Sequence, residues 1–481
     1  MRKLLMALFI LVDLVVIGAV VGGYLFIKSD GFKSSVETLM SESTTTGVTI
    51  ESIDLHWVGL KLKGIRLPNP NPHQDDFFKT NTLEVNIDWK PLLKKNLVIR
   101  SFNIQRPELV LHQSESGGIK LPFKKKAEGA QMPSANKLPF LDGEIQLKTL
   151  ILKDAKITVF DPSGERLLLT EGADIQGELS NQNGIWKLKS NLGINQLIAG
   201  SVLTFDALDS PLSYQENTLE LPTITGRCYE GNVKGDARVD FNPEIPTYSF
   251  QLEGEGIDMD TLMQSFGKDP GFVEGVLTMQ LRGKGNTNVP KDVKGQGSFR
   301  VAPVKMLTSK TTNSSGDQFW MFDTVYVVSQ VTQTAGKFLG LDLDGTFDAL
   351  ESEFTIRDQL IDYQRLEVLS KSIRINMTGT VSFAKQLDLR GEITIQPGES
   401  SLFAQLAGTV ADSIRKKGGK IPFKITGNAE NPKVEIELVE TGLDLGLDLL
   451  DSLLGPKQDE DSEEGEKSGG IKSLLDGVFG N

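Results

Sequence analysis

The segment L-E-V-N-I-D-W, residues 83–89, carries an apolar side chain at every second position. The same alternation recurs at Ile373, Ile375 and Met377, and at Val434, Ile436 and Leu438. A period of two is typical of β-strands with one apolar and one polar face. Gly, Pro, Asn and Asp stand between such runs, as at residues 161–164, so the strands should follow one another as an antiparallel meander.

The apolar period slips by one residue in several strands, for example between Leu62 and Ile65. Bulges that twist and curl a sheet explain such slips. Helical patterns are few and cover residues 32–40, 259–266, 402–414 and 443–454. The sequence therefore predicts a mainly β protein, a long curled antiparallel sheet with a few short helices.

An apolar run at residues 4–27 is long enough for a helix to span a bilayer, because about 20 residues cross a core of about 30 Å. Arg2 and Lys3 precede it, so the positive-inside rule places the N-terminus in the cytoplasm. A cleaved signal peptide is the alternative, but the run exceeds the usual apolar region of roughly 7 to 15 residues. We expect a single-pass anchor despite Asp13. Its candidate residues are Leu4, Leu8, Leu11, Val15, Ile17, Val20, Leu25 and Ile27.

Composition excludes several classes of protein. The net charge of -13 argues against a nucleic-acid partner, which calls for a basic surface. Cys228 is the single cysteine, so no disulfide can form within the chain. The sequence contains no H-E-x-x-H and no G-x-S-x-G motif, and its three histidines are isolated. Residues 340–351 superficially fit a calcium loop but alternate like a strand. We expect no catalytic residue, no metal and no cofactor, and we interpret the chain as a non-enzyme.

The chain divides into eight predicted regions. They are an anchor at 1–29, a first β region at 30–123, a linker at 124–138, a central β region at 139–338, a further β region at 339–438, a leucine-rich helix at 439–456, an acidic tether at 457–470 and an apolar patch at 471–481. The tether cannot bury enough apolar area to order itself. The patch beyond it has helical spacing and could dock on a membrane or an envelope protein through Leu474, Leu475, Val478 and Phe479.

Several blocks carry a resemblance to a known family. They are V-T-I-E-S-I-D-L-H-W-V-G-L-K-L-K-G-I-R-L-P-N-P at 48–70, the segment 83–112 with its Pro-Leu-Leu step at 91–93, and L-K-T-L-I-L-K-D-A-K-I-T-V-F-D-P at 147–162. Three further blocks begin at Phe347, Arg374 and Ile421. In this order behind one anchor they resemble the AsmA family. The resemblance implies a curled β-groove in the periplasm, anchored in the inner membrane, that moves phospholipids toward the outer membrane and supports outer-membrane assembly.

From the residues alone, a sheet with one apolar face is more simply explained by a filled sandwich than by an open groove. The resemblance reverses that preference. A groove lined by apolar residues would shield acyl chains at roughly 0.8 kcal/mol per buried CH₂. The candidate lipid-facing residues are Leu83, Val85, Ile87, Ile373 and Ile375.

Two other functions stay open. A biogenesis factor for outer-membrane proteins would lend its sheet edge to nascent strands, without lipid transport. An anchored enzyme or glycan-binding module would need a polar pocket with convergent ionisable groups, which the sequence does not indicate.

Overall fold

The computed structural model describes residues 30–42, 44–56, 59–71, 74–92, 98–114, 122, 146–182, 185–200, 203–243, 245–286, 293–306, 327–328, 331–332, 345–396, 419–429, 431–436 and 445–446. Among these, no helix has the length and apolar character needed to cross a bilayer. The predicted anchor at 4–27 lies outside the described residues. The linker at 124–138, the helix at 402–414, the tether and the apolar patch also lie outside them.

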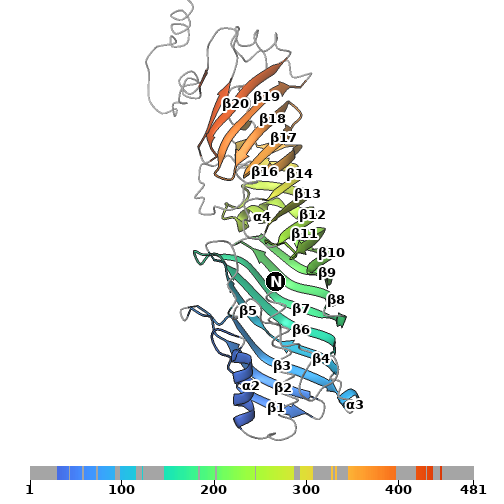
Figure 1. Ribbon diagram of the computed structural model, residues 1–481. Helices are drawn as coiled ribbons and strands as arrows, with labels where there is room; N and C mark the ends of the chain where they lie inside the picture. Colours follow the sequence, from blue (N-terminus) through green and yellow to red (C-terminus); the bar gives the residue numbers. More distant parts are fainter. Residues whose placement is uncertain are drawn as a thin grey trace, which may run out of the picture.

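The described strands form one sheet, confirming the mainly β prediction. Figure 1 shows them stacked along one long axis, from blue β1 to orange β20. The strands are β1 Ser52–His56, β2 Gly59–Leu67, β3 Phe78–Asp88, β4 Val98–Gln105, β5 Glu108–His112, β6 Gln146–Phe160, β7 Arg166–Gln182, β8 Ile185–Ala199, β9 Leu203–Gln215, β10 Thr218–Cys228, β11 Gly231–Asp240, β12 Thr247–Asp258, β13 Val273–Asn286, β14 Lys294–Met306, β15 Thr346–Phe347, β16 Ala349–Arg357, β17 Leu360–Leu369, β18 Ile373–Ser382, β19 Gln386–Ile395, β20 Lys420–Asn428, β21 Asn431–Ile436 and β22 Leu445–Gly446. The helices are α2 Asp30–Glu42, α3 Trp89–Leu92 and α4 Met259–Ser265.

The sheet is mixed, which corrects the expectation of a purely antiparallel meander. β4 pairs in parallel with the first half of β6, and β5 pairs in parallel with its second half. The other described pairings are antiparallel, including those of β3 with β4 and of β6 with β7. A parallel pair needs a crossover of about a dozen residues or more. The long connection between β5 and β6 supplies it. The sequence shows this connection only as a linker, because its turn residues and charges do not indicate the direction in which the next strand runs.

Asp88 at the end of β3 ties this parallel junction together. Its carboxylate accepts hydrogen bonds from Arg100 Nε at 2.8 Å on β4 and from Lys148 Nζ at 3.1 Å on β6. The hydrogen bonds from Arg100 and then Lys148 hold the pKa of Asp88 below its usual range. One carboxylate therefore links three strands across the point where the chain direction changes.

The helix predicted near residues 32–40 is present as α2 and lies beside β1 and β2 (Figure 1). Val36 and Met40, four residues apart and hence on one helix face, are buried in the same cluster as the strand residue Leu62. Glu37 accepts a hydrogen bond from the backbone N–H of Ile50 at 2.7 Å. This helix therefore covers the apolar face of the first strands.

The period slip predicted between Leu62 and Ile65 has a local cause. Gly64 has a backbone φ of 59°, a left-handed value that glycine adopts without steric cost. Leu62 and Ile65 consequently both lie in the core, each about 1% exposed. A residue with a Cβ at this position would also meet the side chain of Glu51 at 2.6 Å.

Within the predicted leucine-rich helix at 439–456, the described residues are Leu445 and Gly446 alone. They are extended and pair with β21 as strand β22. The segment L-D-L-G-L-D-L at 443–449 alternates with period two as well as fitting a helical pattern, so the sequence supports both forms.

Candidate functional site

The apolar face of the sheet is the candidate site, and we call it the inner face. Strand register places its residues in rows that run across the strands, along the long axis of the molecule. One row joins Leu219, Val239 and Tyr248, and another joins Leu221, Ala237 and Phe250. Residues directly opposite each other on neighbouring strands share a face and contact one another. The face therefore forms a continuous apolar wall.

Both ends of this wall are covered by the protein itself. At the N-terminal end, α2 packs on β1 to β3. Toward the C-terminal end, Leu262 and Met263 of α4 and the buried residues Val327, Val328 and Val331 join the cluster formed by the inner faces of β13 to β21. These ends are hydrophobic cores.

The middle of the wall is different, because its apolar side chains are only half-buried. We call this set the central strip. It comprises Leu192, Leu219, Leu221, Val239, Tyr248, Phe250, Leu252, Met279 and Leu281, on β8 and β10 to β13. The first four of these residues also pack against the N-terminal cluster, and the last two pack against the C-terminal cluster. Neighbouring apolar side chains that the described chain leaves partly exposed can form a binding surface.

The predicted lipid-facing residues lie on the apolar face but in the covered ends. Leu83, Val85, Ile373 and Ile375 are each 0% exposed, and Ile87 is half-buried against the N-terminal cluster. Their contact with lipid stays a prediction. The sequence missed the central strip because alternation reveals which face a residue occupies, and not what covers that face.

Glycines opposite aromatic residues keep the central strip flat. The ring of Phe250 lies over Gly283, where an added Cβ would be 2.6 Å from Cζ of the ring. The ring of Tyr248 lies over Gly285 in the same way and stacks beside Phe250, with centroids 6.3 Å apart and planes at 18°. Rings that lie against glycine backbone project little into the space above the sheet. The same arrangement occurs in the covered C-terminal end, where Gly297 lies beneath the buried Phe354, so this Gly signal in the sequence marks the inner face and does not by itself locate the strip.

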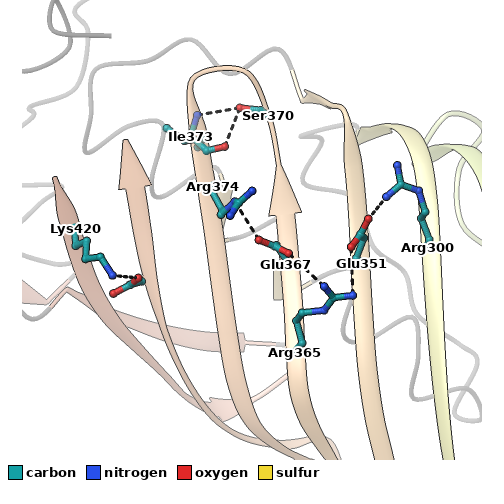
Figure 2. Close-up of polar contacts among 9 residues, drawn as sticks. Arg300, Glu351, Arg365, Glu367, Ser370, Ile373, Arg374 and Lys420 are labelled. Atoms are coloured by element: carbon teal, nitrogen blue, oxygen red, sulfur yellow. Dashed lines mark hydrogen bonds and ion pairs between the residues drawn. The ribbon is translucent and has the colours of Figure 1, made fainter. Parts of the chain in front are cut away.

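The opposite, outer face is polar and is organised by ion pairs between strands. Figure 2 shows a ladder over β14 and β16 to β18. Glu351 pairs with Arg300 and, at 3.4 Å, with Arg365. Glu367 pairs with Arg374 at 3.1 Å and with Arg365 at 3.9 Å. Because each acid is held between two guanidinium groups, these residues fix strand register and carry no free group for chemistry. Glu351 is also the last position of the calcium-like stretch.

Two other side chains that could carry chemistry, those of His112 and Cys228, have the surroundings of structural residues. His112 stacks on Phe160 with ring centroids 5.1 Å apart, and its Nδ1 lies 3.4 Å from Nε2 of Gln74. Burial lowers the pKa of His112, against a smaller opposite effect of Asp75.

The thiol of Cys228 is buried, which raises its pKa to about 12. In the described segments no three His, Cys, Asp or Glu side chains gather as a metal site would require. The side chains of His56 and His73 lie outside the described set.

A cleft of about 660 Å³ opens where β11 and β13 end and where β12 and β14 begin. These strand ends are opposite the ends at which α4 lies. Tyr248 of the central strip lines it together with Arg238, Lys284 and Lys294. The cleft therefore joins the apolar inner face to a basic part of the rim.

Comparison with known proteins agrees with the predicted resemblance. The family model described as AsmA family matches residues 1–183. The N-terminal part of the chain, from the predicted anchor through β7, is therefore similar to the AsmA family, which confirms the predicted resemblance for that part. The likeness of the blocks at Phe347, Arg374 and Ile421 to that family stays a prediction. No curated protein matches the chain, and no solved structure matches it.

Proposed function

We propose that this protein is an inner-membrane-anchored, periplasmic protein that binds phospholipid acyl chains along its central strip and conducts them between the inner and outer membranes. The half-buried apolar rows of β8 to β13 are the observation that carries this proposal. The match of residues 1–183 to the AsmA family and the long curled sheet support it. The apolar run at 4–27 supports the anchor and its orientation. We propose no catalytic role for the chain.

The energetic case rests on burial of hydrocarbon. Each CH₂ group removed from water contributes roughly 0.8 kcal/mol, so an acyl chain lying on the strip gains several kcal/mol without any directional contact. A wall whose rows are mainly apolar holds a chain at no particular position. Such binding suits a protein that conducts lipids more than one that stores them.

The test compares two faces of the same strands. Phe250→Asp with Leu281→Asp places two charges on the strip, whereas Gln251→Asp with Gln280→Asp places the same charges at adjacent positions on the outer face. Lipids that co-purify with the full chain in detergent are counted by mass spectrometry. We expect lipid to be lost from the first variant and retained by the second. Equal lipid content in both variants would refute the proposal.

A photo-crosslinker at position 250 addresses the rival function. Adducts with lipid support conduction, whereas adducts confined to polypeptide would favour a factor that binds nascent outer-membrane proteins.

A further inference from the structure

The cleft at the rim of β11 to β14 contains an arrangement of charge that differs from the rest of the outer face. Lys284 on β13 and Lys294 on β14 are directly opposite each other in register, and both are exposed. Like charges directly opposite on neighbouring strands destabilise a sheet. Neither ammonium group has an acidic partner within the described part of the chain.

Several cations elsewhere on the outer face are matched by acids across the strands, whereas Arg282, beside the lysine pair on β13, faces Gln251 and Gln296. Lys61 faces Glu84, and Arg238 faces Glu220 at 3.0 Å. Two other cation pairs oppose each other, Arg390 with Lys424 and Arg66 with Lys79, and acids stand close to both. Lys424 also faces Glu435 and lies 4.0 Å from Asp388, and Lys79 pairs with Glu108 at 2.8 Å. Lys284 and Lys294 differ from these two opposed pairs, because no described acid pairs with either lysine.

The cleft also contacts the central strip. Tyr248 lines the cleft, and its ring stacks beside Phe250 on the inner face. The lysines lie on the outer face, so a molecule with an apolar chain on the strip would reach them with a group that extends around the strand ends beside Tyr248. The strip and the cleft together thus match an amphiphile: the apolar strip fits its apolar chain, and the basic cleft fits an acidic head group.

We propose that the cleft binds the phosphate group of a glycerophospholipid whose acyl chains lie on the central strip. Lys284 and Lys294 donate charge-assisted hydrogen bonds to the phosphate oxygens, which removes their mutual repulsion. The cleft is lined by three bases, Arg238 and the two lysines, and by two acids, Asp240 and Asp358. Arg238 is already paired with Glu220 at 3.0 Å, so the two lysines are the cations that the cleft offers to a ligand. Two neighbouring ammonium groups suit a single phosphate more than a polyanion. This inference rests on the proposed function and adds a head-group site to it.

The experiment uses the full chain in detergent and two lipids with the same acyl chains, phosphatidylglycerol and diacylglycerol. The variant Lys284→Gln with Lys294→Gln is compared with Lys234→Gln, which removes an exposed lysine on β11. We expect the double variant to retain about tenfold less phosphatidylglycerol, with diacylglycerol unchanged. The control variant should retain both lipids as the parent does. Unchanged phosphatidylglycerol retention in the double variant would overturn the proposal.

Two further measurements separate the possible failures. Thermal unfolding should show the double variant at least as stable as the parent, because it loses a repulsion; a marked loss of stability would assign the lysines a structural role and count against the site. Calorimetry with inorganic phosphate tests the free anion as the source. If inorganic phosphate binds through the lysines while lipid retention is independent of them, the site is for a free anion and the lipid form is wrong. Failure of the parent to retain either lipid would instead refute the proposed function.

Discussion

The contrast between a half-buried strip and covered ends can be tested with two glycines. Gly283 and Gly297 both lie beneath an aromatic ring on the inner face, Gly283 under Phe250 and Gly297 under Phe354. An alanine Cβ would be 2.6 Å from Cζ of Phe250 and 2.5 Å from Cζ of Phe354, whereas ordinary contacts are 3.4 to 4 Å. Each substitution therefore forces its ring to move.

The cost depends on where the ring can go. Phe250 is half-buried, so its ring can swing into the space above the strip. Phe354 is 4% exposed and has Phe299 and Tyr363 on either side, with ring centroids at 6.4 and 5.9 Å. The Cβ at Gly297 would also be 2.9 Å from the carbonyl oxygen of Gln280. Overpacking of this kind costs roughly 1 to 3 kcal/mol.

Replacing glycine by alanine also stabilises each strand by roughly 0.4 to 1 kcal/mol, since the unfolded chain loses freedom. We therefore expect Gly283→Ala to remain within about 1 kcal/mol of the parent and Gly297→Ala to lose about 2 kcal/mol. Amide hydrogen exchange of β13 and β14 is the suitable assay, because it reports the local opening free energy of these two strands within a long sheet. A loss of about 2 kcal/mol corresponds to roughly 30-fold faster exchange. Equal effects at the two glycines would refute the distinction between strip and core.

Two further predictions follow from titratable groups. Because its hydrogen bonds to Arg100 and Lys148 lower the pKa of Asp88, its contribution to stability is present above the unfolded pKa and is lost as the pH falls through the folded value. Asp88→Asn should accordingly lose stability near pH 7 and show a flatter dependence below pH 4 in urea unfolding followed by circular dichroism; a parallel pH profile would contradict this. Burial raises the pKa of Cys228 from 9.0 to about 12, so a disulfide reagent at pH 8 should label the native chain far more slowly than the urea-unfolded chain. Equal labelling rates would show that the cluster around Cys228 opens readily.

Much of the fold could be predicted because local chemistry determines it. Alternation gave the strands, and the apolar positions of α2 and α4 gave those helices. The slip of the apolar period between Leu62 and Ile65 was visible in the sequence, and the structure traces it to Gly64. The direction of β6 could not be read in this way, because a parallel or antiparallel partner presents the same alternation to its neighbour. The Asp88 contacts that hold this junction join residues up to 60 positions apart, and no local pattern connects them.

The site was harder to predict than the fold, and the rows of the inner face show why. The row through Phe250 continues across Gly283 and Gly295 to Ile356 and then Ile361, without a break in register. Phe250 is half-buried, whereas Ile361 is 0% exposed. Both positions meet the same requirement on the strand, an apolar side chain on the inner face. The difference between core and candidate site therefore comes from what lies over the sheet, so the strands supply a uniform wall and its cover decides where a lipid could lie.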